Sequence, residues 1–308
     1  YHRAGVLMFG YVRPSVRDLP EEERIPLIEK FRKMYETMDF YVLYNRFLKK
    51  EGYQTLPRRP LEKRKLRYED VYPVLYLKYR LSRQAERSNI KHLVIDEMQD
   101  YSRLQYLIIR RMFSCKMTIL GDRAQTMADH QQDVLQFLPG IFGKDLRRIE
   151  MRKSYRNTVE IASYAANLIG VTDLELFERH GMPVLERDVT DLEAALREAV
   201  DTLFPDEKTY ETAAVIVPDA KTAERAYLIL REILAEKDFD CGKRLSWLNR
   251  DSSSFKKGLT VTTFYLAKGL EFDQVFSIFP KDEKREMMMQ AQYIAATRAL
   301  HELRVYHI

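Results

Sequence analysis

The feature that most constrains this chain is the stretch from residue 92 to residue 100, His-Leu-Val-Ile-Asp-Glu-Met-Gln-Asp, where a short apolar run passes directly into carboxylates. Leu93-Val-Ile95 is too short for a helix and rich in β-branched residues, which is typical of a buried strand in a parallel sheet. Asp96, Glu97 and Asp100 follow its carboxyl end, the edge at which open α/β sheets bind ligands. The pattern indicates acids that face a metal or a phosphate, although a solvated acidic loop explains this string alone equally well.

Composition sets broad limits on what the chain can be. Its 308 residues suggest about two domains, and 45% hydrophobic residues permit a sizeable core. The net charge of +5 is compatible with nucleic acid or an acidic partner. Cys115 and Cys241 lie far apart, which favours a reducing cytoplasm without disulfides or a zinc site. No apolar run approaches the roughly 20 residues that cross a bilayer, so we expect no membrane partner. Because Tyr1 follows neither an initiator Met nor a signal-like region, we expect a fragment or a polypeptide whose start has been removed.

Strands and helices alternate along most of the chain, which predicts a parallel α/β fold. A turn at 139–144 places the expected domain boundary near residue 145, giving domains 1–145 and 146–308. The expected helices cover 20–34, 68–81, 102–113, 159–169, 192–203, 220–236 and 287–300, and the expected strands cover 93–95, 117–120, 146–151, 213–217, 259–264, 274–279 and 303–307.

The densest basic cluster lies before the first of these strands. It consists of Arg58, Arg59, Lys63, Arg64, Lys65 and Arg67. Such a cluster could follow the phosphates of a nucleic acid, but a solvated helix face is the default interpretation.

Five strings occur in a fixed order along the chain. They are Val94-Ile-Asp-Glu-Met-Gln-Asp100, Ile119-Leu-Gly-Asp-Arg-Ala-Gln125, Lys153-Ser-Tyr-Arg-Asn-Thr158, Val261-Thr-Thr-Phe-Tyr-Leu-Ala-Lys-Gly-Leu-Glu-Phe-Asp273 and Tyr293-Ile-Ala-Ala-Thr-Arg-Ala299. In this order they resemble motifs II to VI of superfamily 1 helicases of the UvrD/Rep type, over roughly residues 68 to 308. The sequences around 72–78, 90–94 and 100–102 look most like the HelD-type branch, which is associated with bacterial RNA polymerase.

The resemblance implies a fold and a function. The fold would be two RecA-like parallel-sheet domains of the P-loop NTPase type, the first one incomplete. The function would be that of the C-terminal motor portion of an ATP-dependent DNA helicase or translocase. Such a motor couples ATP hydrolysis to movement on single-stranded or duplex DNA, or to remodelling of a nucleic-acid-bound complex, with RNA polymerase as a further partner.

The same resemblance assigns roles in the use of ATP and Mg²⁺. Asp96 would hold Mg²⁺, and Glu97 would orient and deprotonate the attacking water. Gln125 would sense the γ-phosphate.

Residues of the later motifs would complete this set. Tyr155 would stack on the adenine, Arg156 and Arg298 would present guanidinium groups to the γ-phosphate, and Glu271 would accept from the ribose or tie the two domains together. Thr262 and Lys268 would contact the nucleic-acid backbone or the interdomain hinge. Read singly, each of these could be an ordinary surface or core residue; as an ordered set they favour the motor.

Two departures from the family pattern stand out. None of the 11 glycines forms the Gly-Lys-Ser/Thr phosphate loop, since Gly143-Lys144 is followed by Asp145. We therefore expect this polypeptide alone to neither hydrolyse ATP nor unwind DNA, the missing N-terminal phosphate-loop segment being part of the same parent chain. In addition, Thr126-Met-Ala-Asp-His130 lacks the large aromatic residues that would stack on a single strand, which favours action on a protein partner.

Two other classes of function compete with the motor. A non-catalytic module docking on RNA polymerase would have no need of Asp96, Glu97, Arg156 and Arg298. A metal-dependent nuclease built on Asp96, Glu97 and Asp100 would lack a second cluster of carboxylates or histidines elsewhere in the chain.

Overall fold

The protein, described by a computed structural model, consists of two compact units. The structure describes residues 20–33, 37, 39–81, 89–122, 125, 133–143, 146–151, 153–172, 175–204, 210–237, 244–250, 252, 257–281 and 286–308. Unit 1 comprises Tyr1–Gly121 and Gln132–Leu146, and unit 2 comprises Asp122–Gln131 and Arg147–Ile308. The main division follows Leu146, and the segment 122–131 groups with the second unit.

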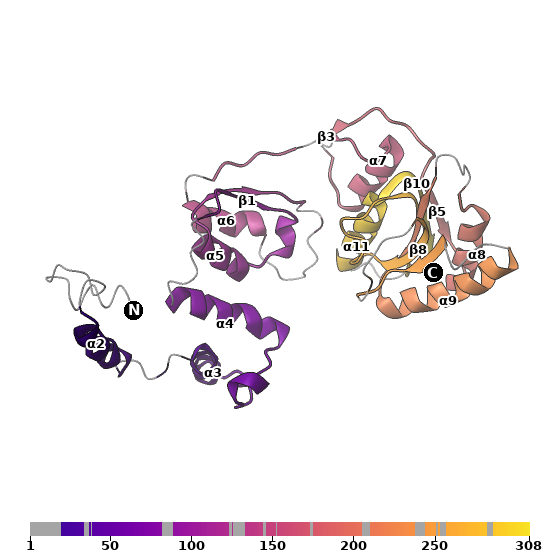
Figure 1. The fold of residues 1–308 in the computed structure, drawn as a ribbon. Coiled ribbons are helices and arrows are strands. Elements are labelled where there is room, and N and C mark those ends of the chain that lie inside the picture. Colours follow the sequence, from indigo (N-terminus) through magenta and orange to yellow (C-terminus); the bar gives the residue numbers. More distant parts are fainter. Residues whose placement is uncertain are drawn as a thin grey trace. The chain divides into compact units, whose positions relative to one another are not determined.

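Unit 2 is organised around a six-stranded, all-parallel sheet (Figure 1). The strand order is β5-β10-β9-β6-β8-β7. The strands are β5 (Leu185–Asp188), β6 (Thr212–Val217), β7 (Leu245–Trp247), β8 (Gly258–Thr263), β9 (Phe272–Phe279) and β10 (Ala299–His307). The fold class is therefore α/β with parallel sheets, as the alternation of strands and helices predicts.

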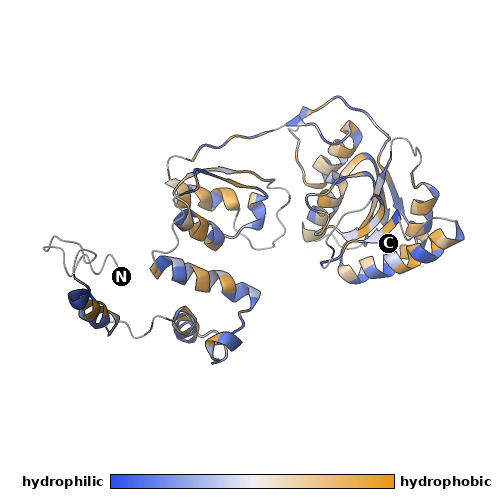
Figure 2. Cartoon of the chain, in the orientation of Figure 1, coloured by the Kyte–Doolittle hydropathy of each residue, from blue (hydrophilic) through white to orange (hydrophobic). Residues whose placement is uncertain are grey.

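Helices cover both faces of this sheet (Figure 1). They are α7 (Val159–Leu168), α8 (Leu192–Asp201), α9 (Ala220–Glu236) and α11 (Glu286–Thr297). Because strand side chains alternate between faces, Val215 of β6 packs in the core with α8 and α9, whereas its neighbour Ile216 packs with α7 and α11. Along α9, apolar and polar residues alternate in the way expected of a helix with one buried side (Figure 2).

Unit 1 contains a smaller α/β part. Its parallel strands β1 (His92–Ile95) and β2 (Lys116–Ile119) pair in register, with Val94 opposite Thr118. Helices α5 (Arg103–Met112) and α6 (Val134–Phe142) pack with them around Tyr106, which is fully buried. Ser102 caps α5, and its side chain and that of Gln105 form a capping box.

The remaining described elements of unit 1 are helices. They are α2 (Glu21–Lys33), α3 (Phe40–Lys50), a single 3-10 turn η2 (Leu61–Lys63) and α4 (Tyr68–Leu81). Helices α3 and α4 share a small core with Leu56, into which Tyr41, Tyr44 and Leu48 are buried.

Three expectations about local structure were wrong. Residues 146–151 form no strand: Ile149 and Met151 are 75% and 87% exposed, and a strand needs a partner that this segment does not have among the described residues. The expected turn at 139–144 is largely helix, because α6 accommodates Pro139 and continues to Phe142, where Gly143, with φ 80°, caps its end. Helix α11 ends at Thr297 and β10 begins at Ala299, earlier than the sequence indicated. No helix among the described residues is long and apolar enough to span a membrane.

Candidate functional site

The carboxylates after β1 lie on a tight turn that begins at the end of that strand. Asp96 is exposed, and its Oδ1 accepts a hydrogen bond of 2.8 Å from the backbone N–H of Glu97. Glu97 has φ 51°, a left-handed conformation that is uncommon for a residue other than glycine. Its carboxylate accepts a 2.6 Å hydrogen bond from the amide of the buried Gln99. Backbone and side chain together therefore fix the direction of the Glu97 carboxylate.

Gly121 allows this turn to lie directly against the end of β2. The N–H of Met98 donates to the carbonyl of Leu120 at 2.8 Å. A Cβ at Gly121 would lie 2.6 Å from the Met98 nitrogen and 2.5 Å from Gln99 Oε1. From the other side, the Tyr106 hydroxyl donates to the Met98 carbonyl at 3.0 Å. Gly121, after β2, is thus required because the acidic turn after β1 packs directly against it.

The acids after β1 fit a magnesium ion that is bound mainly by water and phosphate better than a metal ion that is bound only by protein side chains. Mg²⁺ typically keeps several waters and binds one or two carboxylates together with substrate phosphates, and the exposed Asp96 fits that pattern. Among the described residues, no group of three or more His, Cys, Asp and Glu side chains is arranged to hold a metal ion. Asp96, Glu97 and Asp100 therefore do not form the carboxylate cluster that a nuclease would use.

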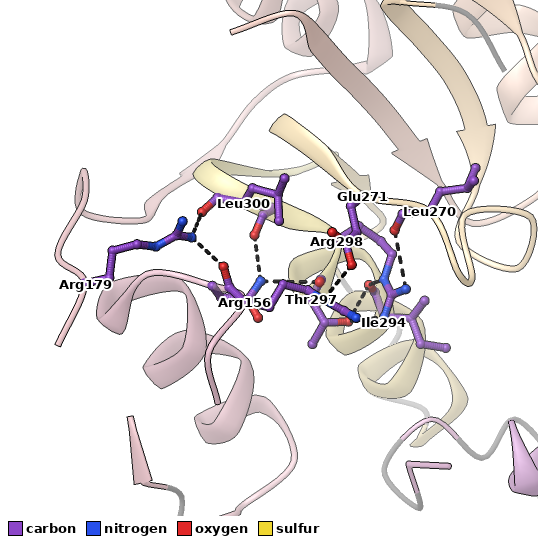
Figure 3. Close-up of polar contacts among 10 residues, drawn as sticks. Arg156, Arg179, Leu270, Glu271, Ile294, Thr297, Arg298 and Leu300 are labelled. Carbon is purple, nitrogen blue, oxygen red and sulfur yellow. Dashed lines mark hydrogen bonds and ion pairs between the residues drawn. The ribbon is translucent and has the colours of Figure 1, made fainter. Parts of the chain in front are cut away.

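In unit 2, Arg156 and Glu271 meet although they are far apart in sequence. Arg156 lies in the turn between β3 (Lys153–Ser154) and α7, and Glu271 immediately precedes β9. Arg156 Nε lies 2.6 Å from Glu271 Oε1, and the two side chains are 49% and 40% exposed (Figure 3). The pair is open to solvent, so that an anionic ligand could compete with Glu271 for the guanidinium group.

Arg298, also expected to contact phosphate, has a different environment. It lies between α11 and β10 and is only 2% exposed. Its guanidinium group donates to the carbonyls of Ile294 and Leu270 and to the hydroxyl of Thr297, at 3.3, 3.4 and 3.1 Å (Figure 3). Leu270 is the residue before Glu271, so Arg298 ties the last turn of α11 to the backbone that carries Glu271.

Two residues with no role expected from the sequence hold these arginines in place. The side-chain amide of Asn157 donates to the carbonyls of Thr297 and Ala299, the neighbours of Arg298, at 3.3 and 2.6 Å. Arg179 donates to the carbonyls of Arg156 and Leu300 (Figure 3). Asn157 lies inside the third of the five motif strings, and that position could have marked it as a candidate. Arg179 lies outside all five strings.

Tyr155, expected to stack on a base, is 65% exposed. Its ring lies 5.7 Å from that of Phe177, which is 46% exposed, and Lys153 Nζ lies 5.4 Å from the centre of the Tyr155 ring. Strand β3 pairs with β4 (Glu175–Leu176), and the N–H of Phe177 donates to the carbonyl of Ser154 at 3.0 Å. The backbone therefore holds Tyr155 and Phe177 as adjoining exposed aromatic rings.

Gln125 is buried in unit 2, near residues of two other motifs. Its amide nitrogen donates to Asp122 at 3.0 Å, and the Tyr293 hydroxyl donates to the same carboxylate at 2.9 Å. Burial and the negative charge of Asp122 raise the pKa of Tyr293, which keeps its hydroxyl protonated as a donor. Lys268 donates to the Gln125 carbonyl at 3.3 Å. The Gln125 side-chain oxygen is buried without a hydrogen-bond partner and so remains able to accept one.

Thr262 is fully buried in β8, where its hydroxyl donates to the Leu248 carbonyl at 3.3 Å. In this conformation it supports the strand and presents no surface to a nucleic acid. Residues 126–130, 144 and 145 and Cys241 lie outside the described residues.

Comparison with protein families links the first part of the chain to helicases. Residues 17–131 match the model of the UvrD/REP helicase N-terminal domain, a range that contains the acidic turn after β1 and the strand β2. This match supports a relationship to UvrD-like superfamily 1 helicases. No curated protein sequence matches the chain.

Several solved structures that resemble the chain are helicases. One is the C-terminal domain of a possible DNA helicase from Lactobacillus plantarum WCFS1, with 25% identity and a TM-score of 0.39 over 50% of this chain and 88% of that one. The helicase of PRRSV has 17% identity and a TM-score of 0.40 over 72% of this chain and 36% of its own. Arterivirus nonstructural protein 10, a helicase in complex with DNA, has 15% identity and a TM-score of 0.36 over 70% of this chain and 40% of its own. The chain thus spans less than half of either viral helicase.

Proposed function

We propose that this chain carries motor elements of a superfamily 1 DNA helicase or translocase that uses ATP and Mg²⁺. The observation that carries the proposal is the grouping of Arg156, Glu271 and Arg298 in unit 2. Three separate motif strings supply these residues, and they meet at the start of β9 and the start of β10. The acids after β1 of unit 1 add further residue types that phosphoryl transfer uses, although the phosphate loop is not among the residues of this sequence.

In unit 1, Asp96 would hold the metal and Glu97 would act on water. Mg²⁺ bound with ATP would neutralise charge on the phosphates. Glu97 would orient the attacking water and accept its proton, with the Gln99 amide fixing the direction of the carboxylate. In unit 2, Gln125, whose side-chain oxygen has no hydrogen-bond partner, would respond to the γ-phosphate.

In unit 2, the two arginines would act in different ways. Arg156 would exchange the Glu271 carboxylate for a phosphate, a step that breaks one solvent-exposed ion pair. Arg298 would have to release at least one backbone carbonyl to do the same, so its first role is to position the segment that carries Glu271. Glu271 would then be free to accept from the ribose, and Tyr155, supported by Phe177, would stack on the adenine.

The protein target of the motor belongs to the proposal as well. We infer a HelD-type motor that acts on a nucleic-acid-bound RNA polymerase, because the sequence after motif III lacks large aromatics for base stacking. Lys268 is proposed as a contact to the nucleic-acid backbone or the hinge. The alternative is a non-catalytic module that docks on RNA polymerase. It differs from the motor in having no use for Glu97 or Arg156.

Phosphate release from Mg-ATP tests the proposal. It should be measured with single-stranded DNA, both for the 308-residue polypeptide and for the entire product of its gene. We expect hydrolysis by the gene product and none by the polypeptide, which contains no phosphate loop. Glu97→Gln and Arg156→Gln should each lower the gene product's rate by about 10² or more.

A matched control is Arg197→Gln, which removes an exposed arginine paired with Glu193 on the surface of α8. Its rate should equal that of the wild type. Hydrolysis that survives Glu97→Gln would contradict the motor, and a gene product without any hydrolysis would favour the docking module. Hydrolysis by the 308-residue polypeptide that Glu97→Gln abolishes would show that the polypeptide is active by itself.

A further inference from the structure

The net positive charge of the chain is concentrated in one segment of unit 1. Residues 57–67, hereafter the basic loop, contain six Lys and Arg residues and one acid, Glu62, for a net charge of +5. The entire chain has 51 Lys and Arg against 46 Asp and Glu, so the remainder has 45 of each sign. The mild basicity of the protein therefore arises from a single loop rather than from a general excess of cations.

Both ends of the basic loop are fixed to the helical core of unit 1. On the entering side, Leu56 is 4% exposed, and the Asn45 side chain makes two hydrogen bonds to its backbone at 2.7 and 3.1 Å. The Tyr41 hydroxyl donates to the Pro57 carbonyl at 2.7 Å. On the leaving side, Leu66 packs against the same core. The loop is thus a built feature of the fold whose position is set before any ligand binds.

Two of the six basic side chains serve to hold the loop. Arg64 lies 2.7 Å from Asp39, donates to the Arg59 carbonyl at 3.0 Å and lies over the ring of Tyr41. Arg67 donates to the buried Asp70 at 2.9 Å. Their charges are matched by carboxylates, so they contribute little to attraction at the surface.

The other four cations are Arg58, Arg59, Lys63 and Lys65, all of them exposed. Within the described part of the chain, no ion pair joins any of them to an acid. They occur within eight residues, and exposed aromatic rings flank them, with Tyr53 and Tyr68 63% and 77% exposed. The loop therefore presents four unmatched charges on a fixed scaffold.

We propose that the basic loop binds the phosphate backbone of a nucleic acid. The inference rests on the proposed function only for its choice of nucleic acid as the polyanion. Protein interfaces are depleted of lysine and bury an apolar centre, whereas here two lysines and two arginines surround a single exposed leucine, Leu61. Phosphate contacts need positive charge without a deep pocket, and this is what the loop offers.

The test is a salt titration of binding. Fluorescence anisotropy would follow the 308-residue chain on a labelled single strand and on a labelled duplex, from about 50 to 200 mM salt. The variant R58Q/R59Q/K63Q/K65Q removes the four unmatched cations and leaves Arg64 and Arg67 in place. We expect affinity to fall at least tenfold at low salt. The slope of log K against log salt should become shallower by about 3 to 4 on duplex and by about 3 on the single strand.

A charge-matched control comes from unit 2. K221Q/R225Q/R231Q/R250Q removes four exposed cations outside the loop, and it should keep the wild-type slope. Circular dichroism should show both variants folded, since none of the eight side chains is buried. Equal slopes for wild type and loop variant would overturn the proposal, as would equal losses in both variants or absence of binding by the wild type.

Two further outcomes distinguish this proposal from an acidic protein partner and from the proposed motor function. Labelled poly-glutamate is expected to bind more weakly than the single strand; if it bound equally well, an acidic protein surface would be the better partner. A gene product that lacks ATP hydrolysis but loses DNA binding in the loop variant would contradict the motor and leave the basic loop as a nucleic-acid contact.

Discussion

Arg156 and Arg298 show that residues of one type in two different motifs can have different physical roles. Arg156 is half exposed and held by one carboxylate, an arrangement that contributes little to stability and is easily exchanged. Arg298 is buried among backbone carbonyls, where loss of the donor leaves acceptors unsatisfied. Variants of Arg298 therefore need a measurement of folding beside any measurement of activity.

Gly121 connects the second strand with the acidic turn, and its replacement tests that connection. Gly121→Ala should destabilise unit 1 by about 1 to 3 kcal/mol, because the new Cβ would lie 2.5 to 2.6 Å from atoms of Met98 and Gln99. Displacement of Gln99 should also release Glu97 and lower ATP hydrolysis by the gene product. Chemical denaturation and phosphate release measure the two effects.

Gly140→Ala is the matched control for Gly121→Ala. Gly140 lies within α6 and a Cβ there would meet no atom within 4 Å, so alanine should stabilise the helix by about 0.5 to 1 kcal/mol. If both alanine variants were equally stable, close packing at Gly121 would not be what the turn requires.

At the residue scale, the sequence indicates candidate site residues better than the residues that hold them in position. Asp96, Glu97 and Arg156 could be singled out as candidates because the strings that contain them resemble helicase motifs in a fixed order, and their roles in phosphoryl transfer are proposals. Asn157 and Arg179 donate three hydrogen bonds to backbone carbonyls that lie more than 100 residues away in the sequence. No sequence pattern encodes such a contact. The burial of Arg298 depends on how α11 packs against β9, so it could not be predicted from the sequence either.

At the element scale, helices α3 and α4 are joined by one buried carboxylate. Asp70, near the start of α4, is 2% exposed and accepts from Tyr44 of α3 at 2.8 Å and from Arg67 at 2.9 Å. The buried acid thus fixes both the α3–α4 contact and the end of the basic loop.

Tyr44→Phe tests this connection. Loss of the hydroxyl leaves one Asp70 oxygen buried without its donor, which should destabilise unit 1 by about 1 to 3 kcal/mol in denaturant titrations. Tyr53→Phe, at an exposed position, should change stability by less than about 0.5 kcal/mol. Equal effects in the two variants would mean that the Tyr44–Asp70 bond contributes nothing measurable.

The same bond predicts a pH dependence. Burial, followed by the hydrogen bond to Asp70, raises the pKa of Tyr44 from 10.0 to about 12. The unfolded chain then loses this proton before the folded chain does. The resulting contribution to stability is complete below pH 10 and is lost as the pH rises from 10 to 12. The difference between wild type and Tyr44→Phe should shrink over this window.

Elements with a strong pattern were predictable and weak ones were not. Helix α9 covers the expected 220–236, and β6 is an apolar run buried on both faces. Segment 146–151 has a strand-like composition but pairs with no strand in the part of the chain that the structure describes, and α6 contains a proline and a glycine that favour a turn. Tertiary contacts decide such cases, and they are not local in sequence.

At the scale of the entire molecule, each unit has its own hydrophobic core. Unit 2 buries both faces of a six-stranded sheet, and unit 1 has two smaller clusters around Tyr106 and Tyr44. The expected boundary near residue 145 rested on a turn at 139–144 that is largely helix, so its place in the sequence remains a prediction. The grouping of segment 122–131 with unit 2 was not predictable, because it involves contacts such as that between Asp122 and Tyr293.

Two cores of unequal size should unfold at different denaturant concentrations. The one tryptophan, Trp247, lies in β7 of unit 2 beside Tyr227, so its fluorescence reports on that unit, whereas circular dichroism at 222 nm reports helices of both. We expect circular dichroism to change first, as unit 1 unfolds, with fluorescence following at higher denaturant concentration. Tyr44→Phe should move the first transition and leave the tryptophan transition in place. Coincident curves that Tyr44→Phe shifts together would instead show that the two cores unfold as one cooperative structure.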